Sequence, residues 1–347
     1  MYYQTKNPHG GDIYGEPIEL DYSANTNPLG VPPAVIAAAS EALTRADRYP
    51  DPYCRDLVTA LSKREAVKPE YILCGSGASG LIFSFCAAAK PKKAAALAPT
   101  FSEYASAVEL FGGEMVLYPL LQERDFLPDG DFLDWLREEE PEAVFLCNPN
   151  NPTGRLLPPE LIIKVLTLCK QINARLFVDE CFLELTGGGE SLKGYLAEFP
   201  GLFLLRAFTK SYGMAGLRLG YCLSADSALL RRMAALTPPW DVSAPAQAAG
   251  IAALGEGDFL RRAVALIERE RPRLHAALEA MGLWVCPSDV NYLLFRGPES
   301  LLGDLRKKGI ALRDCANFPG LSTGWYRMAV RTEEENDRLL AAMKECM

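Results

Sequence analysis

The segment AFTKSYGMAGLRLGY, from Ala207 to Tyr221, predicts both a fold and a kind of chemistry. It overlaps an apolar run, Leu202 to Phe208, that is long enough for one buried β-strand. The strand ends close to Lys210, and the chain passes two glycines before it reaches Arg218. A lysine amine forms a Schiff base with an aldehyde, and the planar arginine fork binds phosphate oxygens. An isolated lysine and arginine in a loop are more often solvated surface residues, so the rest of the chain must decide.

Composition indicates a globular protein without a nucleic-acid or membrane partner. The chain has 347 residues, 49% hydrophobic and 23% charged, and its net charge of −8 argues against a nucleic-acid or anionic membrane surface. We find no apolar segment long enough for a signal peptide or for a membrane span. Ten cysteines without metal-ligand spacing predict reduced thiols in a cytoplasmic protein.

Histidine is scarce in this chain, which contains only His9 and His275. This scarcity nearly excludes a histidine-based catalytic triad or a polyhistidine metal centre, so we predict no metal site. A lysine is then the side chain best suited to move a proton during catalysis.

Short apolar runs alternate with amphipathic helices from residue 53 to residue 254. This alternation is typical of an α/β domain built on a mostly parallel sheet. The predicted strands are Tyr71–Cys74, Ala94–Ala98, Met115–Leu120, Ala143–Cys147, Leu176–Val178, Leu202–Phe208 and Leu219–Leu223. The predicted helices between them include Ala78–Ala89, Ser102–Phe111 and Pro159–Ile172. Such sheets bind ligands at the carboxyl ends of their strands.

The residues on either side of this large domain predict a second unit. We expect residues 1–22 to form an extended arm and residues 23–52 to belong to a small domain and its linker. Residues 255–347 begin with a long predicted helix and continue with short segments and further helices, including the segment ALRD from Ala311 to Asp314. We therefore predict a large α/β domain over residues 53–254 and a small α+β domain at the carboxyl end.

The segment GSGASG, Gly75 to Gly80, follows a predicted strand and opens a helix, as the dinucleotide-binding fingerprint does. That fingerprint needs an acidic residue at the end of the next strand, and the stretch from Ala98 to Phe101 has none. The missing acid counts against a nicotinamide oxidoreductase. The loop fits better as a cradle for a single phosphate, bound by the backbone N–H groups of Ala78 and Ser79.

Three further candidates follow predicted strands. Phe101 is either a core aromatic or a ring that stacks on a flat heterocycle. The segment NPNNPTG, Asn148 to Gly154, forms a tight turn, and an asparagine amide in it can also donate to a ring hydroxyl or phenolate. Asp179 is either a helix cap or the carboxylate that keeps a pyridine nitrogen protonated, which makes the ring an electron sink.

Together these segments resemble the type I pyridoxal-phosphate enzymes over essentially the whole chain. The resemblance rests on NNPTG, FVDE and TKSYGMAGLRLGY. It implies pyridoxal 5′-phosphate as the cofactor, with Lys210 as the Schiff-base lysine and Asp179 as the catalytic partner of the pyridine nitrogen. It also implies a homodimer with shared active sites. The implied cofactor-binding residues are Gly77, Ala78, Ser79, Phe101, Asn151, Asp179, Thr209, Lys210, Arg218 and Tyr49.

Within that superfamily the chain resembles the threonine-phosphate decarboxylases of cobalamin synthesis, whose sister group is the histidinol-phosphate aminotransferases. The likeness is carried by HGGDIY (9–14), SANTNPLG (23–30), RYPDP (48–52), NYLL (291–294) and the tail over residues 312–336. It implies that L-threonine O-3-phosphate, or a close phosphorylated amino acid, loses CO₂ to give aminopropanol phosphate. Transamination of histidinol phosphate or a related amino acid with 2-oxoglutarate is the alternative.

The same resemblance implies which residues bind the substrate. Arg313 and Arg327 are expected to meet its carboxylate and phosphate. His9 and Asn25 are expected to line the pocket for the substrate phosphate, and Tyr49 to reach across the dimer.

Three positions bear on how closely the chain follows its relatives. Phe182 stands where the aminotransferases usually have a tyrosine, as in the decarboxylases. Ala207 replaces a serine that commonly binds phosphate, and Gly80 replaces an acidic residue common in the phosphate loop. A non-catalytic binding protein on the same fold is a further alternative, which the presence of Lys210 and Asp179 disfavours.

Overall fold

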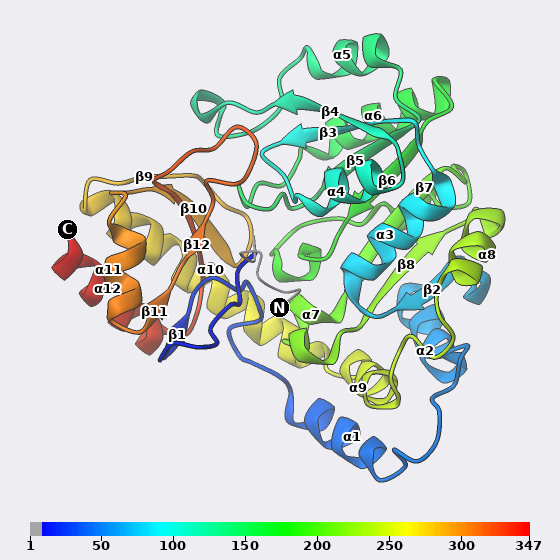
Figure 1. The fold of residues 1–347 in the computed structure, drawn as a ribbon, viewed down its shortest axis with the longest axis horizontal. Helices are drawn as coiled ribbons and strands as arrows, with labels where there is room; N and C mark the ends of the chain where they lie inside the picture. Colours follow the sequence, from blue (N-terminus) through cyan, green and yellow to red (C-terminus); the bar gives the residue numbers. More distant parts are fainter. Residues whose placement is uncertain (1–8) are drawn as a thin grey trace.

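The computed structural model describes residues 9–347, in which a large sheet and a smaller one are surrounded by helices (Figure 1). The strands of the large sheet lie in the order β2-β8-β7-β6-β5-β3-β4. Their bounds are β2 Ile72–Gly75, β3 Lys93–Ala98, β4 Glu114–Pro119, β5 Ala143–Cys147, β6 Arg175–Asp179, β7 Leu202–Ala207 and β8 Gly220–Ser224. Among these described strands, β8 alone points in the opposite direction, so its pairs with β2 and β7 are antiparallel and the remaining pairs are parallel. The predicted seven-stranded, mostly parallel sheet is confirmed.

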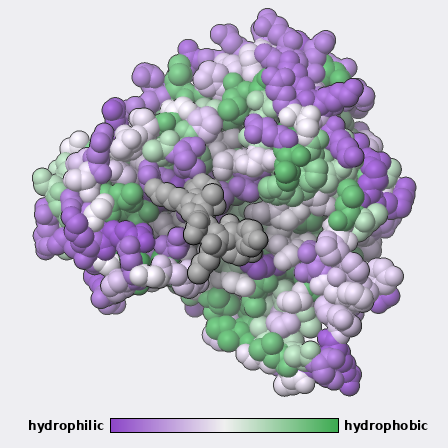
Figure 2. All heavy atoms as spheres, viewed as in Figure 1, coloured by the Kyte–Doolittle hydropathy of each residue, from purple (hydrophilic) through white to green (hydrophobic). Residues whose placement is uncertain are grey.

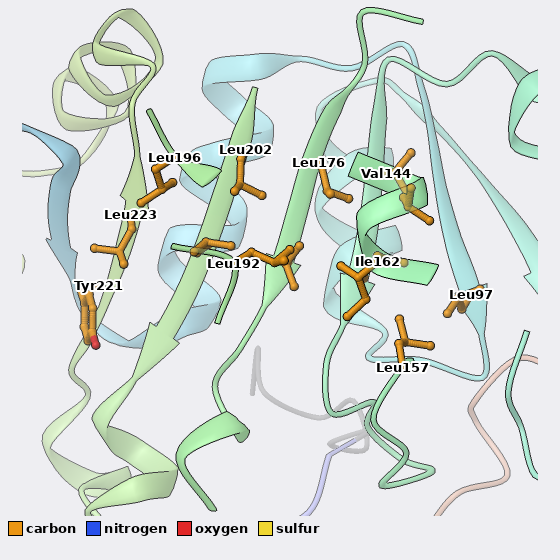
Figure 3. Close-up of a cluster of buried hydrophobic side chains, with 14 of the residues drawn as sticks. Leu97, Val144, Leu157, Ile162, Leu176, Leu192, Leu196, Leu202, Tyr221 and Leu223 are labelled. Carbon is orange, nitrogen blue, oxygen red and sulfur yellow. The ribbon is translucent and has the colours of Figure 1, made fainter. Parts of the chain in front are cut away.

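The central strands are mostly apolar, and β5 is apolar throughout, because both faces of the sheet are covered. Alternate residues enter two separate cores, as the two-residue period of a strand requires. Phe145, Phe177 and Phe203 pack on one face, with ring centroids 4.9 Å apart between neighbouring strands. Leu176 and Leu202 point to the other face, where Figure 3 shows them beside residues of the neighbouring strands.

Helices cover each face of the large sheet. The face that carries the phenylalanines is covered by α3 Gly77–Ala89, α4 Glu103–Leu110 and α8 Ser227–Leu236. The opposite face is covered by α2 Arg55–Glu65, α5 Phe132–Glu139, α6 Pro159–Gln171 and α9 Ala244–Leu254, and α1 Pro33–Leu43 packs on α9. Short 3₁₀ helices lie at Pro69–Tyr71, Gln122–Arg124, Leu183–Leu185, Leu192–Tyr195 and Ala215–Leu217. No helix of residues 9–347 has the length and apolarity needed to cross a membrane.

A separate antiparallel sheet forms the centre of the smaller unit, in the order β12-β13-β10-β9. Its elements are α10 Gly257–Ala280, β9 Trp284–Val285, β10 Tyr292–Arg296, α11 Leu301–Lys307, β11 Ile310–Ala311, β12 Arg313–Asp314, β13 Trp325–Ala329 and α12 Glu333–Cys346. Strand β1, Leu20–Asp21, pairs in parallel with β11 in a separate two-stranded sheet, so the end of the amino-terminal arm is attached to the smaller unit. The segment singled out over residues 311–314 divides between β11 and β12 because these strands pair with different partners.

The strand predicted over Leu202–Phe208 ends one residue earlier than its apolar run indicates, and a short helix follows. Strand β7 ends at Ala207, and Phe208 opens the short helix α7, Phe208–Ser211. The N–H of Tyr212 donates to the carbonyl of Phe208 at 3.1 Å, which closes the helical turn. Lys210 therefore projects from a helical turn at the carboxyl edge of the sheet, and not from the strand itself.

Candidate active site

A cavity of about 320 Å³ lies at the carboxyl ends of the central strands, between the large sheet and the smaller unit. The structure brings most of the predicted site residues together in its wall. They are His9, Asn25, Ala78, Ser79, Phe101, Asn151, Asp179, Thr209, Lys210, Arg218, Arg313 and Arg327. Gly77 and Tyr49 do not line this cavity, although Gly77 directly precedes Ala78.

Lys210 reaches the cavity from α7, with its amine 5.5 Å from the centre of the Phe182 ring. The carbonyl of Lys210 accepts a hydrogen bond from the N–H of Asn27 at 3.0 Å, which ties the turn to the segment after β1. Burial lowers the pKa of Lys210 to about 8, and the positive charges of Arg327 and Arg218 act in the same direction. The neutral amine, which a nucleophile or proton carrier needs, is therefore far more populated near neutral pH than for an ordinary lysine.

Asp179 is the last residue of β6 and is buried. Its Oδ1 accepts from the N–H of Cys181 at 2.9 Å, and its Oδ2 accepts from the Tyr104 hydroxyl at 2.7 Å. Burial raises the pKa of Asp179, whereas the hydrogen bonds from Cys181 and Tyr104 and the charge of Lys210 oppose that rise. The bond to Cys181 belongs to a local turn, so the structure does not support an α-helix cap as the role of this carboxylate.

The amino end of α3 forms a concave site beside a guanidinium group. Gly77 has a φ of 83°, and a Cβ there would lie 2.7 Å from Nη2 of Arg218. A Cβ at Gly220 would lie 2.9 Å from the backbone N of Ala78. Glycine is needed at both positions because any side chain would push Arg218 or β8 away from the helix end. Backbone N–H groups at a helix amino end and an arginine together suit a phosphate.

Asn151 and Arg327 contact each other across the cavity wall. Arg327 donates through Nη1 to Oδ1 of Asn151 and through Nη2 to the carbonyl of Ser23 at 2.8 Å. Its guanidinium also lies 5.5 Å from the centre of the Tyr292 ring. Because the amide oxygen of Asn151 accepts from Arg327, its NH₂ group is the donor that this side chain offers to a ligand.

Arg313 and Arg327 are direct partners in the antiparallel pair of β12 and β13, and both are buried. Like charges placed opposite each other destabilise a sheet. Burial lowers the pKa of both guanidinium groups, and the charge of Arg313 lowers that of Arg327 further. Within residues 9–347, neither arginine forms an ion pair with a carboxylate, so an anionic ligand would offset the cost of burying them.

The arm and the segment after it complete the wall. His9 lies 2.9 Å from a carboxylate oxygen of Glu103, and its ring centre is 5.9 Å from that of Phe101. Asn25 is 1% exposed, and in the described part of the chain neither its amide nitrogen nor its amide oxygen has a hydrogen-bond partner. A buried amide without partners is costly, so these two atoms are suited to a polar ligand.

Other predicted positions lie outside this cluster. Tyr49 is 78% exposed and stacks on Trp240 with 4.3 Å between ring centres. Its expected reach across a dimer stays a prediction. Ala207 is buried in the core of the large sheet, and Gly80 is exposed with open space around it, so nothing in the structure explains either departure from the family pattern.

Sequence reasoning missed Tyr104 and Glu103, which follow Phe101 closely on α4. The spacing from Phe101 to Tyr104, three residues at the start of a helix, places both near one side and is the signal that was available. No group of three or more histidine, cysteine, aspartate or glutamate side chains within the described residues is arranged to hold a metal ion.

Comparison with known proteins now identifies the family. The family model for aminotransferase class I and II matches residues 17–343. The chain belongs to this family. It is 35% identical to threonine-phosphate decarboxylase from Salmonella typhimurium over 94% of this chain and 91% of that protein. It is 33% identical to histidinol-phosphate aminotransferase from Desulfitobacterium hafniense over 95% of this chain and 92% of that protein.

A solved structure shares the fold. Histidinol-phosphate aminotransferase from Sinorhizobium meliloti, in complex with pyridoxal-5′-phosphate, matches with a TM-score of 0.84 and 25% identity. The match covers 95% of this chain and 92% of that one. The resemblance to the type I pyridoxal-phosphate enzymes is therefore confirmed, and relatives of both predicted subgroups are present.

The lowered pKa of Lys210 makes its reactivity predictable. As pH rises through about 8, the amine loses its proton and becomes nucleophilic, well below the ordinary lysine pKa of 10.5. We expect the cofactor-free protein to react with trinitrobenzenesulfonate at this site with a midpoint near pH 8, and Lys210→Ala to lack that reaction. Mass spectrometry of the modified peptide measures it. A midpoint at the ordinary lysine value would contradict the buried setting of the amine.

Proposed function

We propose that the cavity binds pyridoxal 5′-phosphate. Three features of the described residues fit this group. The amino end of α3 with Arg218 suits its phosphate, the Asp179 carboxylate suits its ring nitrogen, and the Lys210 amine suits its aldehyde. When bound, the cofactor supplies an electron-accepting ring, which weakens the bond at the substrate Cα that stands perpendicular to the ring. The relative that was solved with this cofactor supports the assignment.

We propose further that the protein is a carboxy-lyase that decarboxylates L-threonine O-3-phosphate or a close phosphorylated amino acid. The observation that carries this proposal is the buried pair of Arg313 and Arg327, which faces the same cavity as Lys210. Two guanidinium groups match a substrate with two anionic groups, a carboxylate and a phosphate. Asn25 and His9 in the same wall add polar contacts for phosphate oxygens.

Different side chains orient the substrate and return the proton. Arg313 and Arg327 orient the substrate by its anionic groups, which selects the bond that is presented for cleavage. Lys210, with its pKa near 8, returns a proton to the substrate carbon after CO₂ leaves. Phe182 places an apolar ring 5.5 Å from that amine, which limits water beside it.

Aminotransfer is the second candidate, and a specific finding favours it: a histidinol-phosphate aminotransferase is 33% identical over nearly the whole chain. The same cofactor site and the same lysine serve that reaction. The residues that bind and orient the substrate therefore decide between decarboxylation and aminotransfer. Phe182, in place of the tyrosine usual in the aminotransferases, favours decarboxylation.

We expect the protein, supplied with pyridoxal phosphate, to release CO₂ from L-threonine O-3-phosphate without any oxo-acid. Trapped radiolabelled CO₂ and phosphorus NMR of aminopropanol phosphate measure the reaction. Lys210→Ala, folded by circular dichroism, should lose all detectable turnover because the amine has two tasks and no evident substitute. Nitrogen transfer from histidinol phosphate to 2-oxoglutarate, with no CO₂ from threonine phosphate, would establish the aminotransferase instead.

The anion-binding role of the arginine pair is tested by Arg313→Met. We expect kcat/KM for threonine phosphate to fall by about ten- to a hundredfold, or ~1.4–2.8 kcal/mol, because a charge-assisted contact is lost. Arg296→Met, at an exposed position of β10 outside the cavity, is the matched control. Equal kinetics in the two variants would remove Arg313 from the substrate site.

We also propose a homodimer in which Tyr49 reaches the partner's cavity. Tyr49 and Trp240 stack on the surface, and Ile36 and Leu43 of α1 are more than half exposed. Figure 2 shows apolar atoms gathered over the region that α1 occupies in Figure 1. Apolar surface of this kind is typical of an interface between subunits.

Subunit complementation tests this sharing of sites. Mixed dimers of Lys210→Ala and Tyr49→Ala subunits contain one site with both native residues. We expect the refolded mixture to recover about a quarter of wild-type activity, since half the dimers are mixed and each of these has one native site. Absence of recovery, with mixed dimers present by native mass spectrometry, would place Tyr49 outside the partner's site.

A further inference from the structure

Tyr104 is the one buried phenol that touches Asp179 among residues 9–347. It lies on α4, is 1% exposed, and donates its hydroxyl proton to Oδ2 of Asp179 at 2.7 Å. Burial and the neighbouring Asp179 carboxylate raise the pKa of Tyr104 well above its ordinary value. The phenol therefore stays protonated and acts as a permanent donor to the carboxylate.

The ring of Tyr104 is held in place by aromatic neighbours on two sides. It stacks on Phe145 of β5 with 5.5 Å between centres and meets the edge of Phe101 at 5.7 Å. One side chain thus contacts both Asp179 and Phe101, the two residues expected at the nitrogen and at the face of the cofactor ring. This packing leaves the hydroxyl little freedom to move away from the carboxylate.

Asp179 has other titratable neighbours besides Tyr104, among them buried Tyr292 of β10, whose pKa the Asp179 charge helps to raise. Cys147 of β5 and Cys181 contact the carboxylate region with thiols, and burial raises the pKa of both. Lys210 faces it from α7 with a positive charge. The thiol and backbone N–H of Cys181 and the hydroxyl of Tyr104 all lower the pKa of this carboxylate by hydrogen bonding. Tyr104 differs from Cys181 in coming from another element, α4, and in also packing on Phe101.

We propose, on the basis of the proposed cofactor, that Tyr104 is a positioning residue whose hydroxyl sets how strongly Asp179 competes for the proton on the cofactor's ring nitrogen. A hydrogen bond to a carboxylate stabilises its charged form and makes it a weaker base. The shared proton then stays on the ring nitrogen, and the ring keeps the positive charge that makes it accept electrons. Without the hydroxyl, Asp179 draws the proton toward itself and the ring accepts electrons less well.

The test is Tyr104→Phe, which removes the hydroxyl and keeps the ring that packs on Phe145 and Phe101. A less positive ring favours protonation elsewhere on the bound cofactor. We therefore expect the pH midpoint of the visible absorbance change of the protein loaded with pyridoxal phosphate to rise by about half a unit. We expect kcat to fall about tenfold with KM changed less than about twofold, because Tyr104 does not line the cavity where Arg313 and Arg327 lie.

The chain offers a matched control in Tyr221→Phe. Tyr221 is 4% exposed and donates to a carboxylate oxygen of buried Glu65 at 2.7 Å, outside the cavity. Its loss removes the same kind of bond and should lower the melting temperature comparably without moving the absorbance midpoint. A second arm places Tyr104→Phe in an Asp179→Asn background, where we expect no additional shift of the midpoint.

Each outcome decides the inference. A midpoint in Tyr104→Phe equal to that of wild type and of Tyr221→Phe would overturn the role of Tyr104 and leave the proposed function intact. An equal shift in the Asp179→Asn background would also overturn it, since the effect would not pass through Asp179. If wild-type protein gains no visible absorbance band with pyridoxal phosphate, the cofactor assignment and this inference both fall.

Discussion

Burial of charge at the carboxyl edge of the large sheet is the constraint that shapes this protein. Lys210, Arg313 and Arg327 bring positive charge to one cavity, and the buried Asp179 lies in the same wall. Each group is costly to bury alone, and the molecule arranges donors, acceptors and rings around it. The same cost gives the site its chemistry, because a buried lysine loses its proton more easily and buried guanidinium groups favour an anion.

Rigid elements make that arrangement possible. Asp179 ends a strand that is paired on both sides, with β5 and with β7, and its side chain is fixed by Cys181 and Tyr104. Lys210 follows the next strand on a helical turn. The cofactor contacts proposed here thus come from the large sheet, and the substrate contacts come from β12, β13 and the arm. This division of labour allows one scaffold to serve both decarboxylases and aminotransferases.

Much of the fold is visible in the sequence because burial on both faces of a sheet leaves continuous apolar runs. The runs at residues 143–147 and 202–208 match β5 and, apart from Phe208, β7. Candidate residues were also found where they follow such strands, as with Asp179. Gly77, where a Cβ would contact Arg218, likewise lies in the segment GSGASG, which the sequence analysis singled out.

Other features depend on contacts between distant segments and leave no local pattern. The pairing of Arg313 with Arg327 is set by strand register, and the division of residues 311–314 by two different partner strands. Tyr104 was not singled out from the sequence, because its hydrogen bond to Asp179 arises only from the approach of α4 to the end of β6. Subgroup motifs pointed to Arg313 and Arg327, but their mutual contact could not be read from them.

The short segment between β1 and α1 has a mechanical consequence. Tyr22 donates its N–H to the carbonyl of Ala311 in the smaller unit at 2.8 Å, whereas Asn27 donates to the carbonyl of Lys210 at 3.0 Å. The residues between these anchors form a tether across the cavity, with Asn25 near its midpoint. Any hinge motion between the two units must stretch or slacken this tether. A displacement of one unit relative to the other would therefore be transmitted through this segment to the Lys210 turn.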